Sequence, residues 1–272
     1  MCYRQMNFVM KCSTEELALL VSLTGFPNVA KGILETGLGT KTQQEWDAVM
    51  KATAHQLMVK DLWVEEAERN GGIPLSEEMQ MFIKSYVESN YMIRIPDAPN
   101  QHAAMLHHIE GQTWLLHSID RDIIHEFAYM TVDEMPQMIK DYYAFSEKRP
   151  DVQRTFALSD EAFDLLSVRD NVRKVQMLAD LSPEEEIHFQ AFLTDLDNHA
   201  WTLHNISFFH IPSIDEDPYL ENITFFLPGS EGIWVISYQE GEKLPVRVTL
   251  ESTEEWNVMA EGVAIVAKQV SE

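Results

Sequence analysis

The chain has 272 residues, of which 45% are hydrophobic and 10% aromatic, so it can bury a sizeable core and is not a disordered sequence. Its 44 acidic side chains against 20 Lys and Arg give a formal charge of −24, which disfavours binding to nucleic-acid phosphates and anionic lipids. The sequence contains no uncharged apolar run of bilayer-spanning length, and its first residues do not read as a signal peptide. We therefore expect a cytoplasmic protein that binds no nucleic acid and does not insert into a membrane.

The two cysteines, Cys2 and Cys12, lie close together near the beginning of the sequence. A disulfide between them would close only a short loop and would connect no other part of the chain. Two free thiols in a reducing compartment are therefore expected, in agreement with a cytoplasmic location.

Helical patterns dominate the first ninety residues. Ser13 and Glu16 form a capping-box pattern before a helix that Gly25 and Pro27 are expected to end. A second helix is expected over residues 43–60, and a third begins after Ser76, once the turn signal Asn-Gly-Gly-Ile-Pro at 70–74 has interrupted the helical pattern.

Short, partly alternating apolar segments follow and predict an antiparallel meander. The four expected strands cover residues 91–96, 103–111, 113–120 and 122–130. Thr131 and Glu134 then introduce a helix whose Pro136 must lie in the first turn, where a proline is tolerated.

The segment 146–153 is charged, contains Pro150 and has no apolar periodicity, so it is the expected linker. After it come a strand and short helix over 156–168 and a capped helix that begins at Ser182. Four more strands and a final capped helix from Ser252 complete the pattern; the strands are expected over residues 206–212, 222–229, 232–240 and 244–251.

This order of segments repeats within the chain. Met-Ile-Arg-Ile-Pro at 92–96 matches Phe-Phe-His-Ile-Pro at 208–212, and the segment from Trp114 matches the segment from Trp234. We therefore predict an α+β fold of two similar helix–antiparallel-sheet–helix units in a pseudo-twofold, saddle-like arrangement. The units are residues 1–147, with an extra helical insertion, and residues 154–272; they could join into one globular domain.

No motif of a known catalytic or cofactor site occurs. The sequence lacks G-x-S-x-G, a Walker loop, G-x-G-x-x-G and C-x-x-C, so no catalytic residue and no cofactor is predicted. The four histidines of the first meander, at positions 107, 108, 117 and 125, could share a sheet face and bind a metal ion. Their interpretation as ordinary polar-face residues of half-solvated strands is favoured, and a metal-dependent enzyme is kept as an alternative.

Apolar side chains of the second half suggest a partner-binding surface. Phe225 and Phe226 occupy opposite faces of one expected strand, and Trp234, Ile236 and Tyr238 share a face of the next. A strand that is apolar on both faces is either central in a covered sheet or presented to a partner. The predicted contact residues are these five and Trp256 of the last helix.

The order of elements also resembles the EspG-type chaperones of type VII (ESX) secretion. The similarity covers the segment Ser-Thr-Glu-Glu-Leu-Ala-Leu-Leu at 13–20, the helix that ends near residue 63, the helix from 76 and the repeated meander. The resemblance implies a non-catalytic cytoplasmic chaperone that binds a helical secreted substrate and keeps it soluble for export. It places this contact on residues 223–227, 233–239 and the helix from Ser252.

The acidic composition leaves one further alternative open. A regulatory or immunity protein could neutralise a basic partner through a strongly negative surface. Salt sensitivity separates this alternative from the chaperone, because screening weakens attraction between exposed charges more than burial of an apolar surface.

Overall fold

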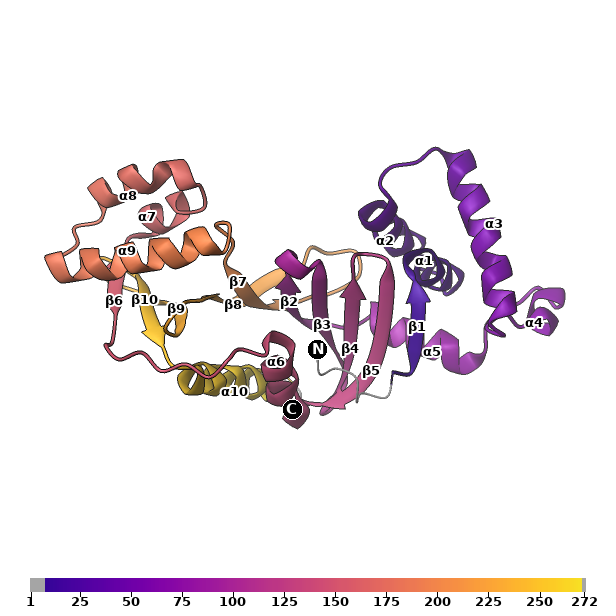
Figure 1. Cartoon of the computed structure of the whole chain (residues 1–272). Helices are drawn as coiled ribbons and strands as arrows, with labels where there is room; N and C mark the ends of the chain where they lie inside the picture. Colours follow the sequence, from indigo (N-terminus) through magenta and orange to yellow (C-terminus); the bar gives the residue numbers. More distant parts are fainter. Residues whose placement is uncertain (1–7, 271–272) are drawn as a thin grey trace. The chain divides into compact units, whose positions relative to one another are not determined.

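The structure is a computed structural model that describes residues 8–270 (Figure 1). It is an α+β fold with antiparallel strands, as predicted. The chain divides into two compact units. The N-terminal unit contains residues 8–132 and Phe208–Glu221, and the C-terminal unit contains Asp133–Ser207 and Asn222–Gln269. Two strands, β7 (His204–His210) and β8 (Tyr219–Pro228), contribute residues to both units, and the ten strands of the described residues form one open sheet.

The N-terminal unit packs helices against the sheet strands β1, β4 and β5. Its strands hydrogen-bond in the order β1-β5-β4-β3-β2, and these neighbours pair antiparallel. The core includes Leu17, Leu20, Leu57 and Phe127, all fully buried. The elements are β1 (Met10–Ser13), α1 (Thr14–Leu23), α2 (Pro27–Leu38), α3 (Gln43–Val59), α4 (Glu65–Arg69), α5 (Glu77–Val87), β2 (Tyr91–Asp97), β3 (His102–Glu110), β4 (Thr113–Asp120) and β5 (Ile124–Thr131).

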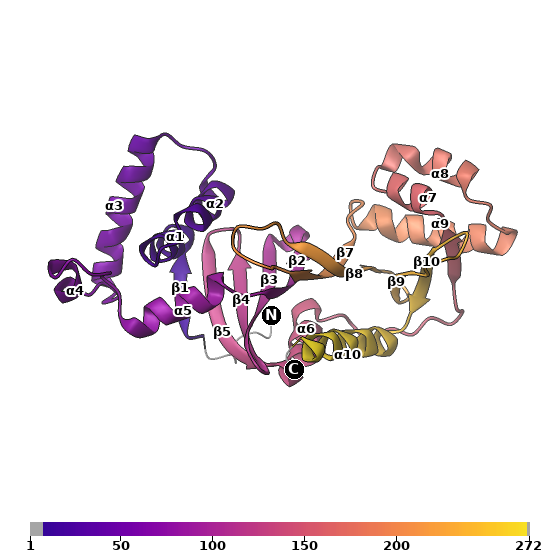
Figure 2. The same ribbon diagram turned by 180° about the vertical axis from the view of Figure 1, so that it is seen from behind.

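The C-terminal unit has helices on both faces of its strands. Its strand order is β7-β8-β9-β10-β6. Helices α7, α8 and α9 cover one face of β6, β9 and β10, and α10 lies across the other face beside α6 (Figures 1 and 2). The bounds are α6 (Met135–Tyr143), β6 (Thr155–Leu158), α7 (Asp160–Leu165), α8 (Val172–Leu178), α9 (Pro183–Asn198), β9 (Ile233–Tyr238), β10 (Val246–Glu251) and α10 (Thr253–Gln269).

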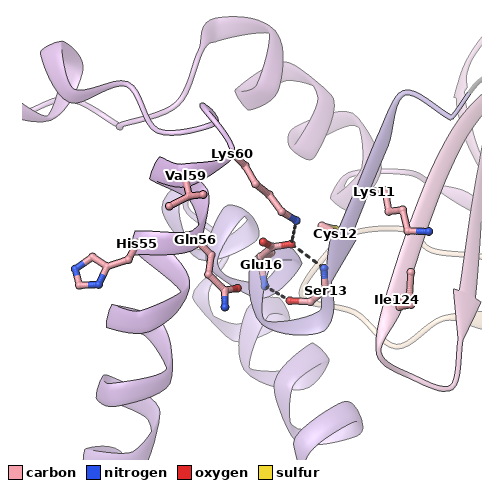
Figure 3. A pocket seen from close by; sticks show the side chains of 9 residues that line it. All are labelled: Lys11, Cys12, Ser13, Glu16, His55, Gln56, Val59, Lys60 and Ile124. Carbon is pink, nitrogen blue, oxygen red and sulfur yellow. Dashed lines mark hydrogen bonds and ion pairs between the residues drawn. The ribbon is translucent and has the colours of Figure 1, made fainter.

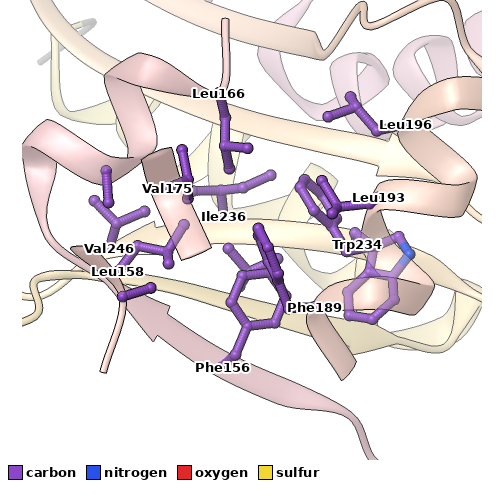
Figure 4. Packing of buried hydrophobic residues seen from close by; sticks show 14 of the residues in the cluster. Phe156, Leu158, Leu166, Val175, Phe189, Leu193, Leu196, Trp234, Ile236 and Val246 are labelled. Atoms are coloured by element: carbon purple, nitrogen blue, oxygen red, sulfur yellow. The ribbon is translucent and has the colours of Figure 1, made fainter. Parts of the chain in front are cut away.

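An aromatic core joins α9 to the strands of the C-terminal unit (Figure 4). The ring of Phe156 packs edge-on to Phe189 and lies 6.2 Å from the ring centroid of Trp234. Asp195, itself buried, accepts hydrogen bonds from Trp234 Nε1 at 2.9 Å and from the Ser230 amide at 3.0 Å. This carboxylate therefore connects α9 to the β8–β9 turn and satisfies the indole N–H inside the core.

Most elements lie where periodicity predicted them, and the first helix ends at Leu23, before Gly25 and Pro27, as expected. Pro27 itself begins the next helix, α2, because a proline at this position gives up only an N–H that has no partner within the helix.

The two halves show the same succession of strand, helices, four strands and helix, and the strand order β1-β5-β4-β3-β2 corresponds to β6-β10-β9-β8-β7. The twofold relation between halves stays a prediction, as do the boundaries at 147 and 154. The compact units divide the chain differently, since α6 packs on α10.

Two glycines of the C-terminal unit give a matched test of this packing. A Cβ on Gly232 would lie 2.4 Å from the Glu251 carbonyl oxygen and 2.9 Å from the Pro150 ring, whereas a Cβ on Gly262 of α10 would meet no atom within 4 Å. Gly232→Ala should lower the free energy of unfolding by about 1–3 kcal/mol through overpacking. Gly262→Ala should raise it by about 0.5–1 kcal/mol through helix propensity. Urea unfolding of both variants measures this, and equal effects would contradict the packing described.

The buried carboxylate of Glu16 caps helix α1 and also forms an ion pair with Lys60. Ser13 and Glu16 form a capping box, in which the Ser13 amide donates to Glu16 Oε2 at 2.9 Å. Lys60, just after α3, places its Nζ 2.7 Å from the same oxygen. The Glu16 side chain is 2% exposed, so this ion pair compensates a charge that the fold removes from water and connects the end of α3 to the start of α1.

Removing the Lys60 ammonium tests that interpretation. Lys60→Met leaves the Glu16 carboxylate buried with one charged partner fewer and should lower the free energy of unfolding by about 1–3 kcal/mol. Lys31→Met is the matched control, because the Lys31–Glu35 pair is exposed on both sides and is expected to contribute about 0–0.5 kcal/mol. Urea denaturation at neutral pH compares the two variants. A Lys60 variant as stable as the Lys31 variant would rule out this anchoring role.

Candidate functional site

The six predicted contact residues separate into buried and accessible side chains. Phe226, Trp234 and Trp256 are at most 1% exposed and Ile236 is 7% exposed, so these four have almost no surface to offer a partner. Their burial follows from helices on both faces of the sheet: Trp234 and Ile236 pack under α9, and Phe226 packs against Trp256 of α10. Tyr238 is 64% exposed at the end of β9, and Phe225 is half-buried.

Phe225 lines an apolar groove of about 600 Å³ in the C-terminal unit. Its floor consists of buried side chains of α9 and of the segment after α7, namely Phe192, Leu196 and Leu166. Its rim consists of half-buried side chains from three separate segments, namely Phe163, Trp201, Leu203 and Phe225. The rings of Phe163 and Phe225 pack edge-on against each other, with centroids 6.1 Å apart, and together form one part of the rim. A groove of this size and character can accept apolar side chains of a partner.

The backbone that carries Trp201 into the groove is strained. Ala200 and Trp201, which follow α9, have φ angles of +50° and +60°. This left-handed conformation is uncommon for residues other than glycine, asparagine and aspartate, and for a bulky residue it is an outlier. Asp197 accepts a hydrogen bond from Trp201 Nε1 and fixes the indole ring. Strain of this kind concentrates at binding sites, so Trp201 is a candidate contact residue.

Negative charge flanks the groove on one side. The short helix α7 has the sequence Asp-Glu-Ala-Phe-Asp-Leu, in which Asp160, Glu161 and Asp164 are exposed and no residue is basic. Asp164 is itself a lining residue. The groove therefore combines apolar walls with an acidic edge, which favours a partner segment that carries apolar and basic side chains.

The favoured interpretation of the meander histidines as polar-face residues of half-solvated strands is wrong for three of the four. Three of them, His107, His117 and His125, are between 2% and 6% exposed, because α5 and the other helices of the N-terminal unit cover their face of the sheet. The ring of Tyr86 on α5 packs edge-on against both His107 and His117. His108 points to the other face, where its Nε2 donates to the Gly111 carbonyl at 2.9 Å.

The hydrogen bonds of this cluster fix the proton positions. The Thr14 hydroxyl donates to the Asp122 carbonyl at 2.6 Å, so Thr14 Oγ1 accepts from His125 Nε2 at 3.0 Å. A neutral His125 then has an unprotonated Nδ1, which accepts from His117 Nε2 at 2.7 Å. This bond takes up one ring nitrogen of each histidine, and His125 Nε2 is bonded to Thr14, so the arrangement does not present the two rings together to a metal ion. Within residues 8–270, no group of three or more His, Cys, Asp or Glu side chains is close enough to hold a metal ion.

Burial keeps these imidazoles neutral. It lowers the pKa of His107 and of His125 to about 4 each. It also lowers the pKa of His117 well below its usual value, and charge on His107 or His125 would lower it further. The unfolded chain binds protons near pH 6.5 at such groups, whereas the folded protein does not. The titration of these histidines therefore leaves the free energy of unfolding unchanged above about pH 6.5 and lowers it as the pH falls towards 4.

This linkage gives a pH prediction. Between about pH 6.5 and 4 the free energy of unfolding should fall with decreasing pH, by up to about 1.4 kcal/mol per pH unit for each buried histidine. His107→Phe removes one such group and should make the pH dependence shallower in this window. Urea midpoints at pH 7.5, 6.5, 5.5 and 4.5 measure both slopes. Identical slopes in the variant and the parent protein would contradict neutral burial of His107.

Several lining residues of the groove were not predicted from the sequence. Phe163, Trp201 and Leu203 belong to segments that are separated from Phe225 along the chain, and the sequence analysis gave them no role. The local signal that could have pointed to Trp201 is its place directly after the end of a capped helix, outside the helical period. Cys12 is a free, buried thiol, as predicted, whereas Cys2 lies outside the described residues.

No helix within residues 8–270 combines the length and the apolar character that crossing a bilayer would need.

Comparison with known proteins identifies the family. The family model described as "Uncharacterised protein YfjC" matches residues 10–255. The chain belongs to the YfjC family. No curated protein matches it. The resemblance to EspG-type chaperones of type VII secretion is therefore wrong. It rested on the order of capped helices and antiparallel strands, which many α+β proteins share, and on no residue that is diagnostic of that family.

Proposed function

We propose that this YfjC-family protein is a non-catalytic adaptor that binds a helical segment of another protein in the groove lined by Phe163, Trp201, Leu203 and Phe225. By covering the apolar side of that segment, it would keep the partner soluble. We place this function in the cytoplasm, where a free thiol such as Cys12 is stable. The observation that carries the proposal is the groove itself, an apolar channel with a buried floor, a half-buried aromatic rim and an acidic edge.

The groove suits a helix for a chemical reason. An amphipathic helix presents apolar side chains at every third or fourth position, and these anchor in grooves lined by aliphatic and aromatic residues. The rigid rings of Phe163, Trp201 and Phe225 lose little side-chain freedom on binding, which makes them suitable anchor contacts. The acidic residues of α7 would select a helix whose polar side is basic, and the formal charge of −24 would speed its approach.

Site-specific crosslinking identifies the partner. A photoreactive benzoylphenylalanine at Leu203 or Phe163, in the groove, should crosslink in the native host to a protein with an amphipathic, basic helix. The same group at Tyr238 is the matched control, since Tyr238 is exposed in the same unit but does not line the groove. Mass spectrometry then identifies the crosslinked segment. Equal yields of the same product at Leu203 and Tyr238 would contradict binding in the groove.

Binding by the identified segment is then measured with purified variants. Phe163→Glu should weaken binding by about 30-fold or more, which corresponds to about 2 kcal/mol for an anchor residue. Tyr238→Glu should leave the affinity unchanged. Thermal unfolding of both variants confirms that they fold. A Phe163→Glu protein that folds and binds like the parent would refute the proposal.

The acidic-surface alternative makes a different prediction in the same assay. If charge alone holds a basic partner, neutralising Asp160, Glu161 and Asp164 as amides should abolish binding and its salt dependence, while Phe163→Glu should have little effect. If apolar anchoring dominates, the amide variant should mainly slow association. Affinities measured at about 50 and 500 mM salt separate the two.

A further inference from the structure

A pocket of about 620 Å³ lies in the N-terminal unit, where β1 leads into α1 and the end of α3 approaches them (Figure 3). Its volume is in the range of small-molecule sites in proteins. It belongs to a different unit from the groove, and neither the family description nor the proposed adaptor function assigns a role to it. The lining residues are Lys11, Cys12, Ser13, Glu16, His55, Gln56, Val59, Lys60 and Ile124.

Only one oxygen of the buried Glu16 carboxylate in this pocket accepts hydrogen bonds from the protein. Glu16 Oε2 accepts from the Ser13 amide and from Lys60 Nζ. Within residues 8–270, Glu16 Oε1 has no hydrogen-bond partner, although the side chain is only 2% exposed. Figure 3 shows this second oxygen on the side of the carboxylate away from Ser13, towards Val59 and Gln56. Oε1 keeps a small exposed area at the pocket, where a hydrogen-bond donor can reach it.

The remaining walls are mainly apolar. Val59, Ile124 and the hydrocarbon stems of Lys11 and Lys60 contribute carbon surface. Cys12 is also apolar in character, because burial raises the pKa of its thiol to about 12 and keeps it protonated. The pocket therefore offers one charged acceptor beside hydrophobic contacts and the polar side chains of His55 and Gln56, and such a mixture is usual in small-molecule sites.

The charges around Glu16 limit the ligand class. A cationic ligand would meet the Lys60 ammonium, which already lies 2.7 Å from the carboxylate. An anionic ligand would meet the carboxylate itself. An uncharged N–H or O–H donor avoids both repulsions and satisfies Oε1 without adding a buried charge.

We propose that this pocket binds a small uncharged molecule that has an apolar body and one N–H or O–H donor, and that the donor bonds to Glu16 Oε1. The apolar body packs against Ile124, Val59 and Cys12. Lys60 holds the carboxylate in this orientation, so that the capping interaction with Ser13 and the ligand contact use different oxygens of one side chain.

Two pairs of probes test the donor requirement. Indole is compared with 1-methylindole, and phenol with anisole, since methylation removes the donor and changes little else. Titration is followed by NMR on the full chain, using the methyl groups of Val59 and Ile124 and the carboxyl carbon of Glu16. In each pair the donor should bind at least tenfold more tightly, and only the donor should shift the Glu16 signal. Equal binding within both pairs, or absence of binding by all four probes, would overturn the proposal.

Two neighbouring isoleucines supply the matched variants. Ile124 lines the pocket, whereas Ile123 is 54% exposed and does not. Ile124→Trp fills the pocket and should abolish the indole-induced shift of the Val59 methyl groups, while Ile123→Trp should preserve it. Thermal unfolding establishes that both variants fold. Undiminished indole binding by folded Ile124→Trp, or its loss in folded Ile123→Trp, would place the probe elsewhere and refute the assignment.

Discussion

The alternation of side chains along strand β8 organises the C-terminal unit. Phe225 and Phe226 are consecutive and must therefore point to opposite faces of the sheet. Phe226 enters the interior beside Trp256 of α10, and Phe225 lines the groove in edge-on contact with Phe163 of α7. Phe226 thus helps to attach α10 to the sheet, and Phe225 forms part of a candidate binding surface. A shift of the strand register by one residue would exchange the two environments.

The packing around this strand also explains why the groove remains open. Helix α9 covers β6, β9 and β10 through Phe189, Phe192 and Leu196, but it ends at Asn198. The chain then turns sharply through Ala200 and Trp201, both in left-handed conformations, before β7 begins. Because the helix stops there, side chains near the end of α9 cover the sheet only partly. The strained turn places an indole ring at the groove edge instead of a further helical turn.

In the N-terminal unit, single polar side chains likewise make several structural contacts. Glu16 caps α1, pairs with Lys60 at the end of α3, and retains one oxygen at the wall of a pocket. The buried histidines are likewise connected, since the carbonyl of Asp122, the Thr14 hydroxyl, His125 and His117 form a continuous chain of hydrogen bonds. Both arrangements provide hydrogen-bond partners for several buried polar groups, and both lie near the start of α1.

The sequence by itself determined the local structure. Capping boxes, turn residues and the periods of apolar residues predicted the α+β class, the eight meander strands and most of the helices, because hydrogen bonding and side-chain alternation within a segment depend on neighbouring residues. Only the tertiary structure decided which apolar side chains are accessible. Trp234 and Trp256 looked like contact residues until helices were found on both faces of the sheet, and the histidines looked half-solvated until α5 covered them. The groove joins segments some sixty residues apart, and such non-local packing leaves no local pattern in the sequence.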